Sequence, residues 1–268
     1  MDNRQNSTIN WYPGHMAKTK KQIAEDLKLI DVVIEILDAR IPIASRNPDI
    51  ETLIQEKKKI VLLNKCDLAD EKENQKWVEY YQEQKIPAIL TDANEGKGIP
   101  ETIRMIEKIT KEEKESALQK GRTGRTIRIM VLGIPNVGKS SFINRIAKKT
   151  TAIVGNKPGV TKQKQWVRVN QNIELLDTPG VLWPKFQNEE IALHLAYTGT
   201  IKDDILEKIE VAYYFLKFML EKHIELLKKR GAILAGGIID EEKTANILLE
   251  DFKSGKLGRI TIETYLKS

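Results

Sequence analysis

The sequence contains very little cysteine and no long apolar run. Its single cysteine, Cys66, excludes an internal disulfide framework and any site built from several cysteine ligands, which favours a reducing compartment. No stretch approaches the roughly 20 consecutive apolar residues that span a bilayer, and the polar start of the chain does not resemble a signal peptide. We therefore expect a cytoplasmic protein with no membrane segment.

The chain is moderately basic, with a formal net charge of +6. Acidic residues slightly outnumber basic ones after Glu189, so the basic excess lies before that point. Such an excess suits contact with RNA or another polyanion. Many cytosolic domains carry a similar excess without such a partner, so charge alone leaves both interpretations open.

Strands and helices alternate over the first two thirds of the chain. We expect strands at 31–37, 60–64, 87–91, 126–133, 164–169 and 173–177, and helices at 16–30, 71–85, 99–109 and 139–147. This alternation predicts an α/β fold with a six-stranded, mostly parallel sheet. The charged segment 111–125 is either a linker or a helix tail with a basic loop.

The pattern changes between residues 180 and 190. Strand signals fade, and apolar residues recur at helical spacing from Ile205 to Leu227. We expect residues 1–185 to form the α/β domain with an N-terminal extension, and residues 186–268 to form a small all-helical domain.

The segment GIPNVGKS, residues 133–140, matches the P-loop pattern between a predicted strand and a predicted helix. In a P-loop, successive backbone N–H groups and the helix N-terminus surround phosphate oxygens. Lys139 should reach the β- and γ-phosphates, and the Ser140 hydroxyl should bind Mg²⁺. The remaining residues predicted to contact the nucleotide here are Asn136, Val137, Gly138 and Ser141.

The tetrapeptide DTPG follows the last predicted strand. We expect Asp177 to hold Mg²⁺ and the backbone N–H of Gly180 to bind the γ-phosphate. Thr161, in the segment KPGVT, is predicted to complete the magnesium shell, although Thr150 and Thr151 compete for that role.

The segment NKCD, residues 64–67, predicts which base is bound. The two oxygens of Asp67 can accept hydrogen bonds from N1–H and the N2 amine of guanine, which adenine does not offer. Asn64 should tie the base edge to the P-loop, and the stem of Lys65 should cover the ring. The segment TDA, Thr91 to Ala93, lies at the end of the next strand, where the backbone N–H of a small residue would meet guanine O6. Asp92 and Ala93 are the residues predicted to contact the nucleotide there.

These motifs stand in an unusual order. Conventional GTPases place the P-loop first and NKxD near the end, whereas here NKCD precedes the P-loop. A circular permutation that cuts the chain after DTPG explains this order. It predicts the spatial strand order 164–169, 173–177, 126–133, 31–37, 60–64, 87–91, with the first strand antiparallel to the rest.

The chain closely resembles the ribosome biogenesis GTPase A (RbgA/YlqF) family of circularly permuted GTPases over essentially its whole length. The resemblance rests on NKCD, GIPNVGKSS, KPGVT, WYPGHMAK (11–18), DARIPIASRNP (38–48) and DTPGVLWP (177–184). It implies a protein that hydrolyses GTP in late assembly of the large (50S) ribosomal subunit, in contact with its rRNA and proteins and stimulated by it. It also implies a helical C-terminal domain that contacts RNA. We expect a monomer.

The resemblance also suggests how hydrolysis is controlled. Val181 stands where many GTPases place a water-orienting glutamine, so intrinsic hydrolysis should be slow. The resemblance points to His15 as the group that acts on water, and a packed or capping histidine is the alternative. His194 and His223 should be structural. Asn136 resembles the asparagine that binds K⁺ in cation-dependent relatives, or it is a simple loop residue.

Some alternatives remain open. The segment DARIPIASRNP is either a salt-bridged turn or, as the family suggests, an RNA or ribosome contact. One rival function is a nucleotide-binding scaffold that never hydrolyses GTP, which intact Lys139, Ser140 and Asp177 argue against. The other is a GTPase that acts on tRNA or another RNA, which the permuted order and the PGHM motif disfavour.

Overall fold

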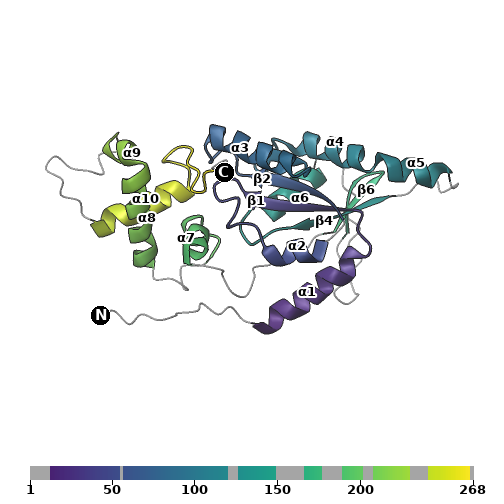
Figure 1. Cartoon of the computed structure of the whole chain (residues 1–268), viewed down its shortest axis with the longest axis horizontal. Helices are drawn as coiled ribbons and strands as arrows, with labels where there is room; N and C mark the ends of the chain where they lie inside the picture. Colours follow the sequence, from purple (N-terminus) through teal and green to yellow (C-terminus); the bar gives the residue numbers. More distant parts are fainter. Residues whose placement is uncertain are drawn as a thin grey trace.

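The computed structural model describes residues 13–54, 57–119, 126–148, 166–176, 189–201, 208–229 and 241–265 (Figure 1). The strands are β1 (Val32–Asp38), β2 (Lys58–Asn64), β3 (Ala88–Thr91), β4 (Ile127–Leu132), β5 (Trp166–Asn170) and β6 (Ile173–Leu176). The helices are α1 (Pro13–Leu27), α2 (Pro48–Ile54), α3 (Glu71–Glu83), α4 (Ile99–Ile109), α5 (Lys111–Gln119), α6 (Lys139–Lys148), α7 (Glu189–Tyr197), α8 (Lys208–Lys222), α9 (Ile224–Lys229) and α10 (Glu241–Lys253).

The strands form a single sheet in the order β3-β2-β1-β4-β6-β5. Strand β5 is antiparallel to β6, and the other neighbouring pairs are parallel. The first strand of the chain, β1, therefore lies near the centre beside β4, which leads into the P-loop. This is the order that the permutation predicts, so the predicted fold is confirmed.

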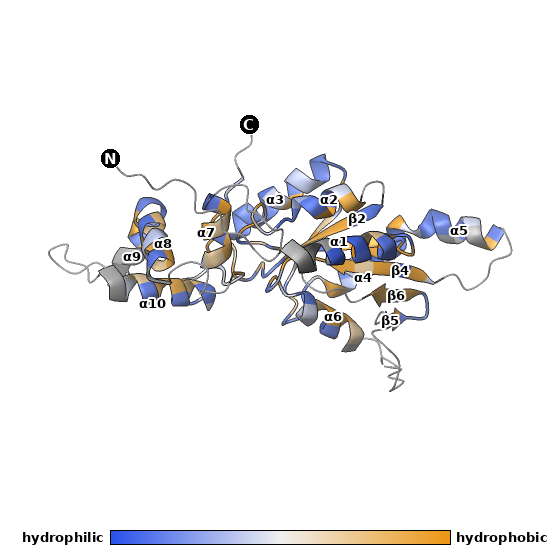
Figure 2. Ribbon diagram, turned by 90° about the horizontal axis from the view of Figure 1, so that it is seen from below, coloured by the Kyte–Doolittle hydropathy of each residue, from blue (hydrophilic) through white to orange (hydrophobic). Residues whose placement is uncertain are grey.

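Helices cover both faces of the sheet, which is why its central strands are apolar on both sides. Every residue of β1 is buried. On one face, Ile34 and Val131 share a cluster with Ile106 of α4 and Phe142 of α6. On the other face, side chains of α1, α2 and α3 pack against the sheet. Figure 2 shows the result, with hydrophobic strands in the interior and hydrophilic residues on the helices outside.

Local signals set the ends of two helices. The Asp70 carboxylate accepts hydrogen bonds from the backbone N–H groups of Lys72 and Glu73 and so caps α3. Gly98, with φ of +79°, precedes α4, and a Cβ there would lie 2.4 Å from the backbone oxygen of Leu90. Only glycine fits this turn because the chain passes so close to β3.

Two helices go beyond the sequence prediction. Helix α2 has seven residues, begins at Pro48 and carries too short an apolar pattern to be recognised in advance. Helix α5 occupies the first part of the segment 111–125, so that part is helical, and residues 120–125 lie outside the described ranges. None of the helices described is both long and apolar enough to cross a membrane.

The C-terminal helices pack on one another through aromatic rings and lie to one side of the sheet in Figure 1. The Phe215 ring of α8 lies 5.1 Å from that of Tyr197 in α7 and 5.0 Å from that of Phe252 in α10. These side chains belong to the same hydrophobic cluster as one face of the sheet. The helical part therefore shares a core with the α/β part, and a division at residues 185/186 stays a prediction.

After α10 the chain returns to the α/β part. We call residues 257–265 the C-terminal strap. The backbone N–H of Ile260 donates to the Leu68 oxygen at 3.0 Å. Farther along, Trp77 Nε1 donates to the backbone oxygen of Glu263 at 2.9 Å. The last described residues thus lie against the loop that follows β2 and against α3, beside the predicted base-binding segment.

Candidate functional site

The predicted phosphate-binding loop joins β4 to α6. Helix α6 begins at Lys139, whose side chain is buried and donates from Nζ to the Ile134 oxygen at 3.0 Å. The next residue, Ser140, is exposed. A helix that begins directly after a glycine-containing loop presents free N–H groups and a positive dipole end to an anion. The loop can therefore hold phosphate, and Ser140 offers a hydroxyl on the open side.

Asn64 joins the base-binding segment to the P-loop. Its Nδ2 donates to the backbone oxygen of Val137 at 2.7 Å. Its Oδ1 accepts a hydrogen bond from Thr91 Oγ1 at 3.2 Å and another from the backbone N–H of Ala93 at 3.0 Å. One buried amide therefore links the loops after three different strands, as the prediction that Asn64 ties the base edge to the P-loop requires.

The same bridge explains the glycine before Lys139. Gly138 has φ of +98°, a backbone conformation that residues with side chains rarely adopt. A Cβ at Gly138 would lie 2.2 Å from Asn64 Nδ2. The backbone of Gly138 lies so close to the Asn64 amide that any side chain at position 138 would displace the amide and break the bridge.

The base-binding segment itself has one anchored and one open side chain. Lys65 has φ of +59°, and its Nζ lies 2.9 Å from Asp38 Oδ2. Asp67 is exposed, so its carboxylate is accessible to a base edge. Between them, Cys66 is buried, and this burial raises the pKa of its thiol. The Cys66 side chain packs in a hydrophobic cluster with Leu63 and Trp77.

The polar groups of the segment after β3 form hydrogen bonds within the protein. The Asp92 carboxylate accepts hydrogen bonds from the backbone N–H groups of Asn94 at 2.9 Å and Glu95 at 3.2 Å. The Ala93 N–H, expected to meet guanine O6, donates to Asn64. Asp92 and Ala93 thus shape the loop beside the base-binding segment, and a direct contact of either with the base stays a prediction.

Asn136 lies at the junction with the helical part. It is exposed, has φ of +62°, and donates from Nδ2 to the Gly199 oxygen at 2.9 Å. Gly199 follows α7, so this contact connects the P-loop to the C-terminal helices. The Oδ1 atom of the same amide is an acceptor, and the K⁺ contact predicted for Asn136 stays a prediction.

The remaining predicted residues are described only in part. Val137 is fully buried, and Ser141 is half-buried on α6. His15 lies in α1, but its side chain is outside what the structure describes. Thr161, Asp177, Gly180 and Val181 lie outside the described residues. Of the three predicted magnesium ligands, Ser140 is thus the one that the structure describes.

Both histidines expected to be structural lie within packed regions. His194 Nδ1 lies 2.7 Å from Glu263 Oε1. His223 follows α8, packs its ring 5.7 Å from that of Phe218, and has a pKa lowered by burial.

Asp38, Arg40 and Glu263 were not predicted as site residues. The first two belong to the segment DARIPIASRNP, in which the structure shows a salt-bridged turn: Arg40 donates to Asp38 from Nε at 2.9 Å and from Nη2 at 2.8 Å. The sequence did signal the pair, since an acidic and a basic residue stand two positions apart at the end of an apolar strand and can form a salt-bridged turn. Glu263 offered no such signal.

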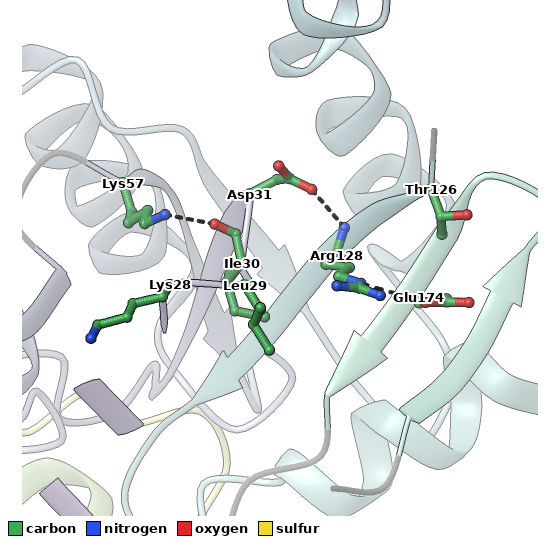
Figure 3. A pocket seen from close by; sticks show the side chains of 8 residues that line it. All are labelled: Lys28, Leu29, Ile30, Asp31, Lys57, Thr126, Arg128 and Glu174. Carbon is green, nitrogen blue, oxygen red and sulfur yellow. Dashed lines mark hydrogen bonds and ion pairs between the residues drawn. The ribbon is translucent and has the colours of Figure 1, made fainter. Parts of the chain in front are cut away.

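A hollow of about 660 Å³ lies at the amino ends of the strands, opposite the predicted motifs (Figure 3). It is lined by residues that precede or begin β1, β2, β4 and β6, whereas the predicted motifs follow the strands. Lys57 donates to the Ile30 oxygen at 2.9 Å, and Arg128 lies near Glu174. Because ligands of open α/β sheets bind outside the carboxyl ends of the strands, and this hollow lies at their amino ends, it is not the nucleotide site.

The chain is similar to named GTPases along nearly its whole length. Residues 128–234 match a family model described as 50S ribosome-binding GTPase. The ribosome biogenesis GTPase A of Bacillus cereus is 45% identical to it over 96% of this chain and 94% of its own. Structures of YlqF bound to GDP, and of Thermotoga maritima YlqF bound to GNP, are 27% and 28% identical, each with a TM-score of 0.61. They cover 91% and 92% of this chain and 98% of their own.

Proposed function

Because this chain belongs to the ribosome biogenesis GTPase A family and is a GTPase, we propose that it acts in late assembly of the large (50S) ribosomal subunit and that the subunit stimulates its hydrolysis of GTP. The ribosomal role is supported by the named relatives. The observation that carries the nucleotide-binding part of the proposal is the Asn64 bridge, which joins the base-binding segment to the P-loop in one buried hydrogen-bonded unit. A site of this kind binds base and phosphates together.

The residues proposed to bind the nucleotide divide between its two ends. Asn64, Lys65 and Asp67, with Asp92 and Ala93 beside them, take the guanine. Asn136, Val137, Gly138, Lys139, Ser140, Ser141 and Gly180 take the phosphates. The exposed position of Asp67 and the helix start at Lys139 support this division.

Mg²⁺ is proposed as the cofactor, held by Ser140, Thr161 and Asp177. The donor set fits the ion, since hydroxyl and carboxylate oxygens are the ligands that Mg²⁺ prefers. When bound, Mg²⁺ neutralises charge that develops on the phosphate oxygens. K⁺ is proposed as a second cation at the amide oxygen of Asn136, and the contact of its Nδ2 with Gly199 holds the amide in a defined orientation.

His15 is proposed to act on the attacking water, with Lys139 and Thr161 as the other groups close to the reacting phosphate. Val181 cannot orient water because its side chain has no polar atom. A histidine can accept a proton or a hydrogen bond near neutral pH. Docking on the large subunit is proposed to bring His15 to the attacking water and so to switch hydrolysis on.

The proposed partners are guanine nucleotide and the rRNA and proteins of the large subunit, and the proposed location is the cytoplasm, with the protein a monomer. The basic charge before Glu189 supports an RNA partner. The described helices are not suited to crossing a membrane.

Two measurements test this function together. GTP turnover should rise when purified large subunits are added, and Lys139→Ala should abolish turnover with and without them. Sedimentation should show the protein on large subunits with a non-hydrolysable GTP analogue and much less with GDP. Stimulation by tRNA instead of subunits would favour the RNA-directed alternative, and tight GTP binding without any turnover would favour the scaffold.

A further inference from the structure

A buried ionic group lies directly beneath the base-binding segment. Asp38 is the last residue of β1 and is fully buried, and it pairs in register with Asn64 at the end of β2. Its carboxylate meets the Arg40 guanidinium through two hydrogen bonds and lies 2.9 Å from Lys65 Nζ. Three charged groups thus converge where β1 and β2 end.

Electrostatics favour the charged form of this carboxylate. Burial by itself would raise the pKa of Asp38, but the neighbouring charges of Arg40 and Lys65 lower it well below its ordinary value. Asp38 is therefore an anion at any physiological pH. It carries two cations, one of which, Lys65, extends to the surface.

The Arg40 side chain is held in place by packing. It is 1% exposed, and its guanidinium carbon lies 5.0 Å from the centre of the Phe252 ring in α10. Its backbone oxygen accepts a hydrogen bond from the N–H of Ile262 in the C-terminal strap at 2.9 Å. Packing from the helical part and the strap thus fixes Arg40, and Arg40 fixes the Asp38 carboxylate by a two-point contact.

Lys65 is the flexible member of the group. A lysine side chain has a flexible stem of four carbons, and ordering this stem on ligand binding costs free energy. The ion pair with Asp38 orders the ammonium in advance. An anchored Nζ leaves the apolar stem as the part available to lie against a flat ring.

We propose that Asp38 is a positioning residue of the nucleotide site: it holds the Lys65 ammonium so that the stem is ready to cover the guanine ring. Arg40 acts behind it by keeping the carboxylate in place. The inference rests on the proposed nucleotide site. It also assigns a role to the segment DARIPIASRNP that involves no RNA contact.

The rival role for Asp38 is purely structural, in which it only neutralises buried Arg40. The two roles differ in one respect. A structural carboxylate would act on stability whether or not Lys65 is present, whereas a positioning carboxylate would act on the nucleotide only through Lys65.

A double-mutant cycle separates these roles. The affinity and dissociation rate of a fluorescent GDP are measured for Asp38→Asn, Lys65→Met and the double variant, with the melting temperature of each protein without nucleotide. Methionine keeps an unbranched stem and removes the ammonium. Each single variant should weaken GDP binding about tenfold, through faster dissociation. The double variant should bind no more weakly than Lys65→Met alone.

Base discrimination gives a second readout. Lys65 covers the ring and does not read its edge, so Asp38→Asn should weaken binding of GDP and of inosine diphosphate by the same factor. The proposal is overturned if Asp38→Asn weakens GDP binding equally in the Lys65→Met background. It is also overturned if Asp38→Asn lowers only the melting temperature.

Two further variants keep the result decisive. If Asp38→Asn does not fold, Lys65→Arg and Lys65→Met take its place. Lys65→Arg should retain most of the GDP affinity because its cation still reaches Asp38. Wild-type affinity in Lys65→Met would overturn the proposal. Asp67→Asn tests the site itself. If Asp67→Asn leaves GDP affinity unchanged, the proposed nucleotide site fails; if it weakens GDP binding while Asp38→Asn does not, the inference about Asp38 alone fails.

Discussion

Asn64 Nδ2 lies 2.7 Å from the backbone oxygen of Val137, although 73 positions separate the two residues. The contact joins the segment that reads the base to the loop that holds the phosphates. Chain order does not matter to it, because β2, β1 and β4 are neighbours in the sheet whichever segment comes first. A permuted chain can therefore build the same nucleotide site as an unpermuted one.

Asn64→Ala should damage both stability and binding. The substitution leaves the Val137 oxygen and the Ala93 N–H without their partner, at about 1–3 kcal/mol for each buried group. We expect the free energy of unfolding to fall accordingly and GDP affinity to drop more than tenfold. Urea unfolding and a fluorescent-GDP titration measure these effects.

The matched control for Asn64 is Thr110→Val. Thr110 is equally buried and donates to the Ile106 oxygen at 2.7 Å, at the end of α4 away from the P-loop. It should lose stability and keep its GDP affinity. An Asn64→Ala protein that bound GDP as tightly as this control would show that the bridge does not hold the site together.

Asp67→Asn should change which base is accepted. The amide places a donor where guanine also offers a donor, so GTP affinity should fall at least tenfold. Xanthine carries an oxygen in place of the N2 amine, so tolerance for xanthosine triphosphate should rise. Competition titrations with both nucleotides measure this, and Glu71→Gln, an exposed carboxylate nearby, is the control. Unchanged GTP affinity in Asp67→Asn would exclude NKCD as the base-reading segment.

Glu263→Ala should loosen the C-terminal strap and α7 together. The Glu263 carboxylate accepts hydrogen bonds from the backbone N–H groups of Ile43 at 2.6 Å and Ala44 at 3.1 Å, and it lies 2.7 Å from His194 Nδ1. Hydrogen bonds to a charged group contribute roughly 1.5–3 kcal/mol each. We therefore expect the free energy of unfolding to fall by several times the effect of Glu250→Ala, an exposed position on α10.

The same variant tests whether the two parts of the chain unfold together. With a shared core, the wild-type protein should unfold in one cooperative transition, followed by circular dichroism and by the fluorescence of Trp77 and the other tryptophans. Glu263→Ala should separate the two signals. Two separate transitions already in the wild type would instead favour independent domains divided near residue 185.

His15→Ala should act on stimulated hydrolysis and little else. If docking on the large subunit brings His15 to the attacking water, the variant should bind GTP and subunits normally. It should lose most of the stimulated rate, since such groups are typically worth about 10²–10⁴-fold. The slow intrinsic rate should barely change. Single-turnover kinetics with saturating subunits measure this. Full stimulation in His15→Ala would mean that the subunit or a bound cation supplies the group.

The sequence by itself determined the fold class and the principal motifs. Apolar strands, the spacing of GIPNVGKS and the position of NKCD are local patterns, and each carries its own chemistry. Their order, interpreted as a circular permutation of the conventional GTPase sheet, predicted the strand order that the structure shows.

Only the tertiary structure decided which side chains support those motifs. The Asp38–Lys65 ion pair depends on the register of β1 with β2, and the contact of Glu263 with Ile43 joins residues 220 positions apart. The Ala93 N–H pairs with Asn64 because β3 lies beside β2 in the sheet. Periodicity records which face of an element is buried, but the partner of a buried polar group is set by distant packing, which no local pattern encodes.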